Sequence, residues 1–185
     1  MLLNGPPSCG KTALARALQR SLPEPWFHRS LDDFRAGYLE QSWESDDGTL
    51  FDRVMAGYLA SLRALALEGI DLLAEAVITP GRRRAYAAAF GGLDVMLIGL
   101  RCPLDVALER ERHRADRRTG PMDLPPAAFA AIHAGMGYDL DIDTATGTPE
   151  SIAAAILQRL HEGPRTAFGR LAAAAALPPP PPALE

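Results

Sequence analysis

The segment Gly5–Thr12, GPPSCGKT, fits the pattern G-x-x-x-x-G-K-[ST] and stands between two segments that limit the fold strongly. Residues 1–4 are apolar enough for a short buried strand, and residues 11–22 place apolar side chains at helical spacing. A strand, a glycine-rich turn and a helix in this order gather backbone N–H groups and the positive end of the helix around one anion. The segment therefore predicts a phosphate-binding loop in an α/β protein. The weaker alternative is a turn that only caps an ordinary helix.

Each position of this loop has a physical reason. Gly10 would let the backbone approach a phosphate closely, Lys11 would reach the β- and γ-phosphates of ATP, and the Thr12 hydroxyl would hold Mg²⁺. Lys11 is also the single lysine among 19 basic residues, and a guanidinium is a poor substitute for a compact ammonium in a narrow site. We expect ATP and Mg²⁺ as cofactors, bound by the whole loop: Gly5, Pro6, Pro7, Ser8, Cys9, Gly10, Lys11 and Thr12.

The rest of the chain alternates between the two kinds of element. Strands are predicted at residues 26–31, 70–78, 93–100 and 140–142, and helices at 50–67, 80–90, 103–112, 124–136 and 149–160. This alternation predicts an α/β fold with a mostly parallel five-stranded sheet between two helical layers. We expect one domain over residues 1–162. The remaining residues, 163–185, are an Ala- and Pro-rich low-complexity tail that we expect to be extended or disordered.

Charge and composition exclude several kinds of function. The net charge of −4 and the pI of about 5.6 disfavour nucleic acid as a partner, and no apolar run is long enough to cross a membrane. We expect no signal peptide, and Cys9 and Cys102 form no CxxC pair, so we expect a cytoplasmic protein without a disulfide framework. Cys9 precedes a helix whose positive end lowers a thiol pKa, so we expect it to be sensitive to oxidation.

Three carboxylates are candidates for the chemistry. Asp32 and Asp33 follow the second strand, at the edge where α/β proteins bind ligands. Asp32 is our preferred base for an acceptor hydroxyl, and the alternative is that the pair only caps the next helix. Glu75 lies near the end of the third strand, where it would support Mg²⁺ or stand as a solvated charge.

An arginine-rich stretch, residues 110–118, falls where a lid would close over the phosphates. Arg114 and Arg117 are our candidates for stabilising charge on the transferred phosphoryl group. The alternative is a solvated helical face, because Glu109 and Glu111 are interleaved with the arginines. A second run, residues 82–84, is interpreted as surface, and His133 as a packing residue.

Several segments together resemble the chloramphenicol phosphotransferase-like family of P-loop kinases. They are LLNGPPSCGKT at 2–12, LPEPW at 22–26, LDVMLIGLRCP at 93–103, ERERHRADR at 109–117, and the pattern H-x₄-Y-D-x-D-x-D-T at 133–144. The resemblance spans residues 1 to about 160.

The resemblance implies a P-loop kinase fold with a small Arg-rich lid at about 110–124. It also implies transfer of the γ-phosphate of ATP to a hydroxyl of a small molecule. Lys11 would lie at the phosphates, Asp32 would be the base, and Arg114 and Arg117 would belong to the lid. Residues 143–148 would lie near the adenine.

The acceptor stays open at this point. It is either chloramphenicol, which would make the protein an antibiotic-resistance enzyme, or another hydroxyl compound. A metabolite kinase of the shikimate, gluconate or adenylylsulfate type fits the same residues. A nucleotide-binding switch that transfers no phosphate is the alternative from another class of protein.

Overall fold

Five parallel strands form the centre of the molecule in the computed structural model, which describes residues 1–113, 125–160, 162 and 164–176. Their order across the sheet is β2-β3-β1-β4-β5. Leu3 of β1 pairs with Glu75 of β3 on one side and with Ile98 of β4 on the other. The strand bounds are β1 (Leu2–Asn4), β2 (Phe27–Arg29), β3 (Leu72–Ala76), β4 (Leu97–Arg101) and β5 (Leu140–Asp143).

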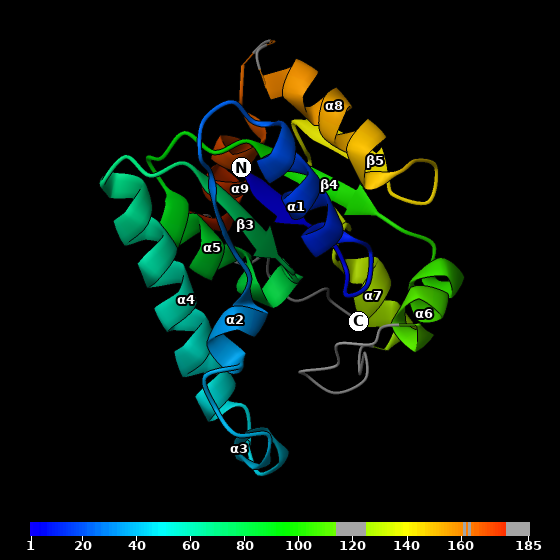
Figure 1. Cartoon of the computed structure of the whole chain (residues 1–185). Coiled ribbons are helices and arrows are strands. Elements are labelled where there is room, and N and C mark those ends of the chain that lie inside the picture. Colours follow the sequence, from blue (N-terminus) through cyan, green and yellow to red (C-terminus); the bar gives the residue numbers. More distant parts are fainter. Residues whose placement is uncertain (114–124, 161, 163, 177–185) are drawn as a thin grey trace, which may run out of the picture.

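Helices cover both faces of this sheet, so the predicted three-layer α/β/α architecture is confirmed (Figure 1). Helices α1 and α8 pack on one face, and α4, α5 and α9 on the other. The helix bounds are α1 (Lys11–Ser21), α2 (Leu31–Arg35), α3 (Gln41–Glu44), α4 (Thr49–Leu67), η1 (Pro80–Arg82), α5 (Arg83–Phe90), α6 (Leu104–Arg112), α7 (Pro126–Ala131), α8 (Pro149–Leu160) and α9 (Ala167–Ala176).

The strands read as continuous apolar runs because both of their faces are buried. On β3, Leu73 packs in the core beneath α1, whereas Ala74 and Ala76 pack in the core beneath α4 and α5. Side chains alternate along a strand, so Glu75 projects to the same face as Leu73. This places a carboxylate on the side of the sheet that α1 covers.

Tyr58 of α4 fixes the carboxyl ends of β2 and β3 together. Its buried hydroxyl lies 2.7 Å from the carbonyl oxygen of Glu75 and 3.2 Å from that of Arg29. Burial raises the pKa of Tyr58 well above its usual value of 10. The hydroxyl therefore stays protonated and able to donate at the edge of the sheet where the functional candidates lie.

The prediction of an extended tail is wrong for residues 167–176, which form helix α9 against α5 (Figure 1). Ala167 and Phe168 are buried, and the Phe168 ring centre lies 6.0 Å from that of Phe90. Alanine has the highest helix propensity, so an alanine run becomes a stable helix once an aromatic residue anchors it. The proline run that follows lies outside the described residues.

Among the described residues, no helix is long and apolar enough to span a membrane.

Candidate active site

The loop between β1 and α1 has the backbone geometry of an anion cradle. Ser8 and Gly10 adopt positive φ angles of 58° and 98°, and α1 begins at the next residue, Lys11. Alternating right- and left-handed residues turn successive N–H groups toward one side. Gly5 is needed for another reason, because a Cβ there would lie 2.6 Å from the carbonyl oxygen of Leu100.

Lys11 lies inside this loop rather than in solvent. It is 9% exposed, and its Nζ donates to the carbonyl oxygens of Gly5 at 2.9 Å and Pro6 at 2.7 Å. A buried ammonium needs such partners, since its charge is costly away from water. The side chain thus brings a positive charge to the place where the backbone N–H groups converge.

Two distant elements hold the Cys9 carbonyl of the loop, and neither contact could be assigned from the sequence. The Thr144 hydroxyl donates to it at 2.7 Å, and Arg110 Nη1 of α6 donates at 3.2 Å. Arg110 also donates to the Thr144 hydroxyl at 3.0 Å and to the Thr144 carbonyl at 2.8 Å. The only sequence signal was the presence of both residues in the segments that carry the family resemblance.

A further contact joins the loop to α6. The Ser8 hydroxyl donates to the carboxylate of Glu111, which is buried. The alternative of a solvated helical face is therefore wrong for Glu111. Together with Arg110, this contact places the last turn of α6 directly against the phosphate loop. The described part of the arginine-rich stretch, residues 110–113, therefore starts beside the loop. The lid itself stays a prediction.

The Cys9 thiol does not have the lowered pKa that its place before a helix suggested. Burial raises the pKa of Cys9, and this effect outweighs the neighbouring Lys11 charge, which lowers it. The expectation of an oxidation-sensitive thiol is therefore wrong, because the thiol is fully buried and its pKa is raised rather than lowered. Burial also raises the pKa of Cys102.

The structure separates the two neighbouring aspartates, which lie in the first turn of α2. Asp33 forms a capping box with Ser30, accepting from its N–H at 2.8 Å while the Ser30 hydroxyl accepts from the Asp33 N–H at 3.3 Å. Asp32 takes no part in the cap. Its side chain is 49% exposed, with Arg35 at 3.8 Å. The helix cap thus explains the presence of Asp33 alone. The Asp32 carboxylate remains available to contact a ligand.

Glu75 is not a solvated charge at the end of a strand. It is 8% exposed, and its Oε1 lies 2.9 Å from Nε2 of His28 on β2. Burial has the largest effect on the pKa of the Cys9 thiol and Lys11 the next largest. The negative charge of Glu75 follows, and it raises that pKa further. The carboxylate therefore lies near the phosphate loop, with His28 fixing its orientation.

Asn4, the last residue of β1, anchors a chain of hydrogen bonds at the same edge of the sheet. Its Oδ1 accepts from the Ile78 N–H at 2.8 Å, and its Nδ2 donates to the Tyr138 hydroxyl at 2.8 Å. That hydroxyl lies 2.8 Å from His133 Nδ1. Burial lowers the pKa of His133 and raises the pKa of Tyr138 to about 12. His133 thus belongs to this hydrogen-bonded chain, and its interpretation as a packing residue stays a prediction.

The arginine predictions have mixed outcomes. Arg114 and Arg117, the proposed lid residues, lie outside the described residues. Within the run that was interpreted as surface, Arg84 is exposed, but Arg82 and Arg83 are half-buried. Arg83 donates to the carbonyl of Ala134, and the guanidinium carbon of Arg82 lies 4.5 Å from the ring centre of Phe51.

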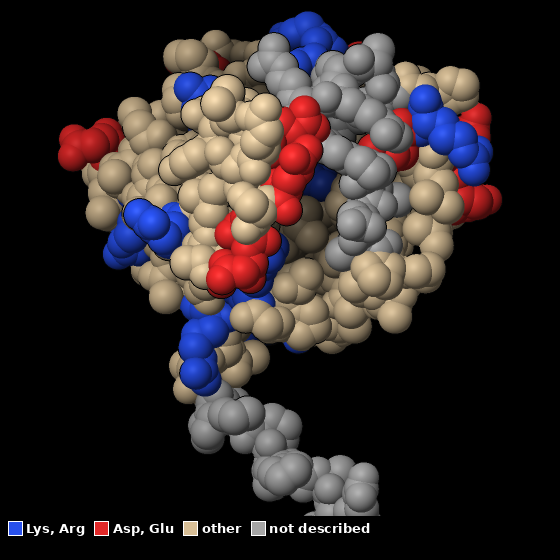
Figure 2. Space-filling view, turned by 90° about the horizontal axis from the view of Figure 1, so that it is seen from below, with Lys and Arg blue, Asp and Glu red and all other residues tan. Residues whose placement is uncertain are grey.

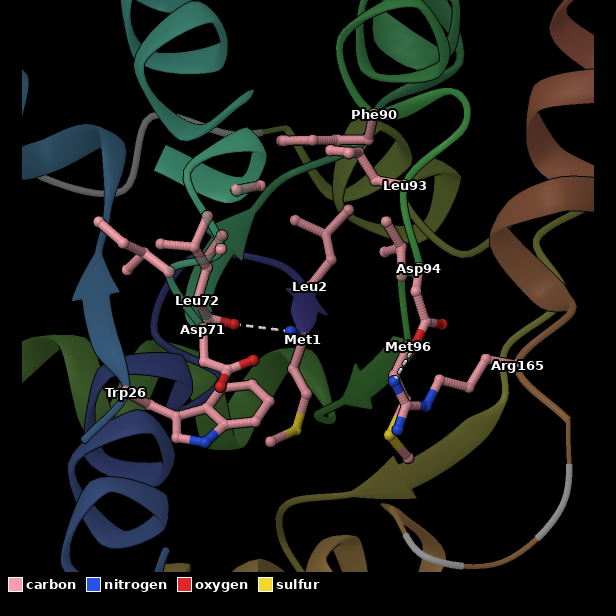
Figure 3. A pocket seen from close by; sticks show the side chains of 15 residues that line it. Met1, Leu2, Trp26, Asp71, Leu72, Phe90, Leu93, Asp94, Met96 and Arg165 are labelled. Atoms are coloured by element: carbon pink, nitrogen blue, oxygen red, sulfur yellow. Dashed lines mark hydrogen bonds and ion pairs between the residues drawn. The ribbon is translucent and has the colours of Figure 1, made fainter. Parts of the chain in front are cut away.

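The surface is hollowed at the carboxyl ends of the strands. Figure 2 looks onto this end of the molecule and shows a recess with basic atoms deep inside it and acidic side chains along one side. A separate cavity of about 250 Å³ lies at the amino ends of the strands (Figure 3). Leu2, Trp26, Phe90 and Met96 line it, and an ion pair between Arg165 and Asp94 closes one side. Because α/β sheets bind ligands at the carboxyl ends of their strands, this second cavity is not the phosphate site.

Solved structures with the same fold include kinases and a resistance protein. The Deinococcus radiodurans tunicamycin resistance protein aligns with a TM-score of 0.63 and 23% identity, over 89% of this chain and 96% of its own. The adenylylsulfate (APS) kinase CysC of Mycobacterium tuberculosis, in complex with AMPPNP and APS, gives 0.58 and 16%, over 87% and 96%. A gluconokinase of Sinorhizobium meliloti 1021 gives 0.57 and 16%, over 94% and 93%. At these identities the likeness shows the fold, which is that of P-loop kinases.

Sequence relatives point to the same class of protein. Two Mycobacterium tuberculosis proteins, each named "Putative O-phosphotransferase" (MT2714 and Rv2636), are 28% identical over 201 aligned positions, covering 92% of this chain and 86% of theirs. The model of the family described as chloramphenicol phosphotransferase-like protein matches residues 1–161. Family and fold together support a phosphotransferase of the kinase class. The chain belongs to the chloramphenicol phosphotransferase-like family.

Proposed function

We propose that the protein transfers the γ-phosphate of ATP to a hydroxyl group of a small molecule. The observation that carries the proposal is the loop Gly5–Thr12 at the carboxyl end of β1, where Ser8 and Gly10 turn the backbone inward and Lys11 is buried beside it. This arrangement suits the phosphates of a nucleotide. Asp32 lies at the same edge of the sheet, so the loop and a carboxylate share one end of the molecule.

Asp32 is the base in this proposal. Its carboxylate takes the proton of the acceptor hydroxyl while the hydroxyl oxygen forms a bond to the γ-phosphorus. The bond between that phosphorus and the oxygen bridging to the β-phosphate breaks, and ADP leaves with the bridging electron pair. Lys11 and the loop N–H groups hold the phosphates during transfer. Arg114 and Arg117 stay proposed as further cations for the transferred group.

Mg²⁺ fits the residues beside the loop. Among the described residues, no group of three or more His, Cys, Asp or Glu could hold a metal by itself, and P-loop kinases need none because the phosphates are the main ligands. Thr12 would hold the ion through its hydroxyl, and Glu75, oriented by His28, would bind its water ligands. When bound, the ion would neutralise charge on the phosphates.

The acceptor class stays a choice between chloramphenicol and other hydroxyl compounds. The family name favours chloramphenicol and a role in antibiotic resistance, whereas the structural neighbours include proteins named as APS kinase and gluconokinase. Chloramphenicol, gluconate and adenylylsulfate therefore define the first screening panel.

The test is an ATP-consumption screen with Mg²⁺ over chloramphenicol, gluconate, adenylylsulfate and other hydroxylated metabolites. Asp32→Asn is expected to lower kcat by about 10²–10⁴-fold, as loss of a general base does, with the Kd for ATP unchanged. Lys11→Ala is expected to weaken ATP binding itself. Asp33→Asn is the matched control, because an asparagine preserves the cap and turnover should stay near that of the parent. ATP binding without turnover on any acceptor would favour the nucleotide switch instead.

A further inference from the structure

Two arginines from separate elements share the ring of Phe51, and one of them, Arg35, lies 3.8 Å from Asp32. The guanidinium carbon of Arg35, at the end of α2, lies 6.0 Å from the ring centre of Phe51 on α4 and 5.0 Å from that of Trp43 on α3. The guanidinium carbon of Arg82, on η1 after β3, lies 4.5 Å from the same Phe51 ring. We call these four side chains, Arg35, Trp43, Phe51 and Arg82, the Arg35–Arg82 platform.

The two guanidinium groups of the platform are poorly neutralised. Arg35 has Asp32 at 3.8 Å as its ion partner, and its Nε is buried without a hydrogen-bond partner among the described residues. Within the same part of the chain, the Arg82 side chain makes a cation–π contact but no hydrogen bond or ion pair. The Asp46 carboxylate, which precedes α4, pairs with neither arginine. It accepts hydrogen bonds from the N–H groups of Leu50 and Phe51 at the start of α4.

Packing alone does not account for this arrangement. A cation–π contact engages the face of the guanidinium and satisfies none of its five N–H donors, and two like charges on one ring repel each other. Arginine instead suits a site that takes an oxyanion, because its planar fork can give two parallel N–H···O bonds. The position next to Asp32 places such an oxyanion within the expected acceptor site.

We propose that the acceptor carries an anionic group, a carboxylate, sulfate or phosphate ester, which Arg35 and Arg82 bind while its hydroxyl lies at Asp32. The inference rests on the proposed function for the hydroxyl, but the anion site itself stands on the platform alone. It makes Arg82 a binding residue for the acceptor, and it makes the substrate a hydroxylated acid or a phosphorylated or sulfated alcohol. Neutral compounds would then be poor acceptors.

A direct binding experiment tests the anion site without any turnover. Sulfate is titrated into the Lys11→Ala protein, which lacks the cation of the phosphate loop, at ionic strength held constant with chloride. Trp43 fluorescence reports the platform, while Trp26 lines the cavity at the opposite edge of the sheet and gives a constant background. The expected result is a saturable change that is about 10–100-fold weaker after Arg82→Gln and unaltered by Arg53→Gln, a matched loss of charge at an exposed position of α4. No saturable change, or equal weakening by both variants, overturns the anion site.

Acceptor pairs that differ only in charge provide the second test. Gluconate is compared with gluconamide, and each other hydroxy acid in the panel with its amide. The expected result is a kcat/KM at least about tenfold higher for the charged member, with the preference lost in Arg82→Gln through KM rather than kcat. Equal rates for both members overturn the inference while the kinase proposal stands. Saturable sulfate binding with no transfer to any acceptor overturns the kinase proposal, while the anion site stands.

Discussion

Replacing Asn4 by leucine tests how strongly the end of β1 is tied to the surrounding elements. Asn4 is fully buried, accepts from the Ile78 N–H and donates to the Tyr138 hydroxyl, both at 2.8 Å. Leucine has the same branched arrangement of heavy atoms, with two bulkier methyl groups in place of the amide oxygen and nitrogen, and can make neither bond. The substitution therefore removes two hydrogen bonds without leaving a large cavity.

The expected cost follows from the groups that lose their partners. A buried polar group without a partner costs about 1–3 kcal/mol, so Asn4→Leu should lower the free energy of unfolding by about 2–4 kcal/mol. Tyr138→Phe deprives the Asn4 amide of its acceptor and should lower it by about 1–2 kcal/mol. In the double variant both members of that bond are absent, so its loss should be smaller than the sum of the single losses.

Urea unfolding of the parent, the two single variants and the double variant, followed by circular dichroism, gives the four free energies of the cycle. Losses that add to within about 0.5 kcal/mol would refute the coupling of Asn4 and Tyr138. A loss below about 1 kcal/mol for Asn4→Leu would show that the buried Ile78 N–H finds another partner.

Three further outcomes are expected. Phe168→Ala should lower the free energy of unfolding by about 3–5 kcal/mol, because the buried ring packs on Phe90; an unchanged Tm in calorimetry would mean that α9 lies outside the core. Burial lowers the pKa of His133 below the value of 6.5, so acidification from pH 7.5 to 5.5 protonates the unfolded chain first and lowers stability. His133→Asn should lose less stability than the parent over that range in urea titrations, and equal losses would contradict this account. Burial raises the pKa of Cys9, so iodoacetamide at pH 8 should alkylate it at least about tenfold more slowly in the folded chain than in urea; similar rates would contradict a buried thiol.

The sheet could be predicted from the sequence because strands buried on both faces leave an unmistakable local pattern. LDVMLIGL at 93–100 is such a run, although the strand itself begins only at Leu97. The four residues before Leu97 lead into the strand. Apolar character alone cannot distinguish such residues from those that pair with a neighbouring strand. Helix α9 was missed for the opposite reason, because an alanine run has no periodic pattern of apolar and polar residues. The contact that holds this helix, between Phe168 and Phe90 of α5, is not visible in the sequence.

The loop of the candidate site was equally predictable, since Gly5, Gly10 and Lys11 lie within seven residues of one another and each has a local backbone or charge requirement. The contacts that support it were not. Arg110 reaches the Cys9 carbonyl across 101 positions of sequence, and His28 meets Glu75 across 47. Such pairs depend on which strands become neighbours, and no local pattern specifies which carbonyl a given guanidinium will find.

The Cys9 carbonyl accepts hydrogen bonds from both Thr144 and Arg110, and this sharing has a thermodynamic consequence. A ligand that reshapes the loop changes the free energy of the α6 contact and of the Thr144 contact together, and reciprocity requires that a ligand bound beside Thr144 changes loop affinity by the same factor. A nucleotide touches several parts of such a site at once. Its affinity then differs from the product of the affinities of its separate parts, and the difference is the coupling free energy carried through one peptide oxygen.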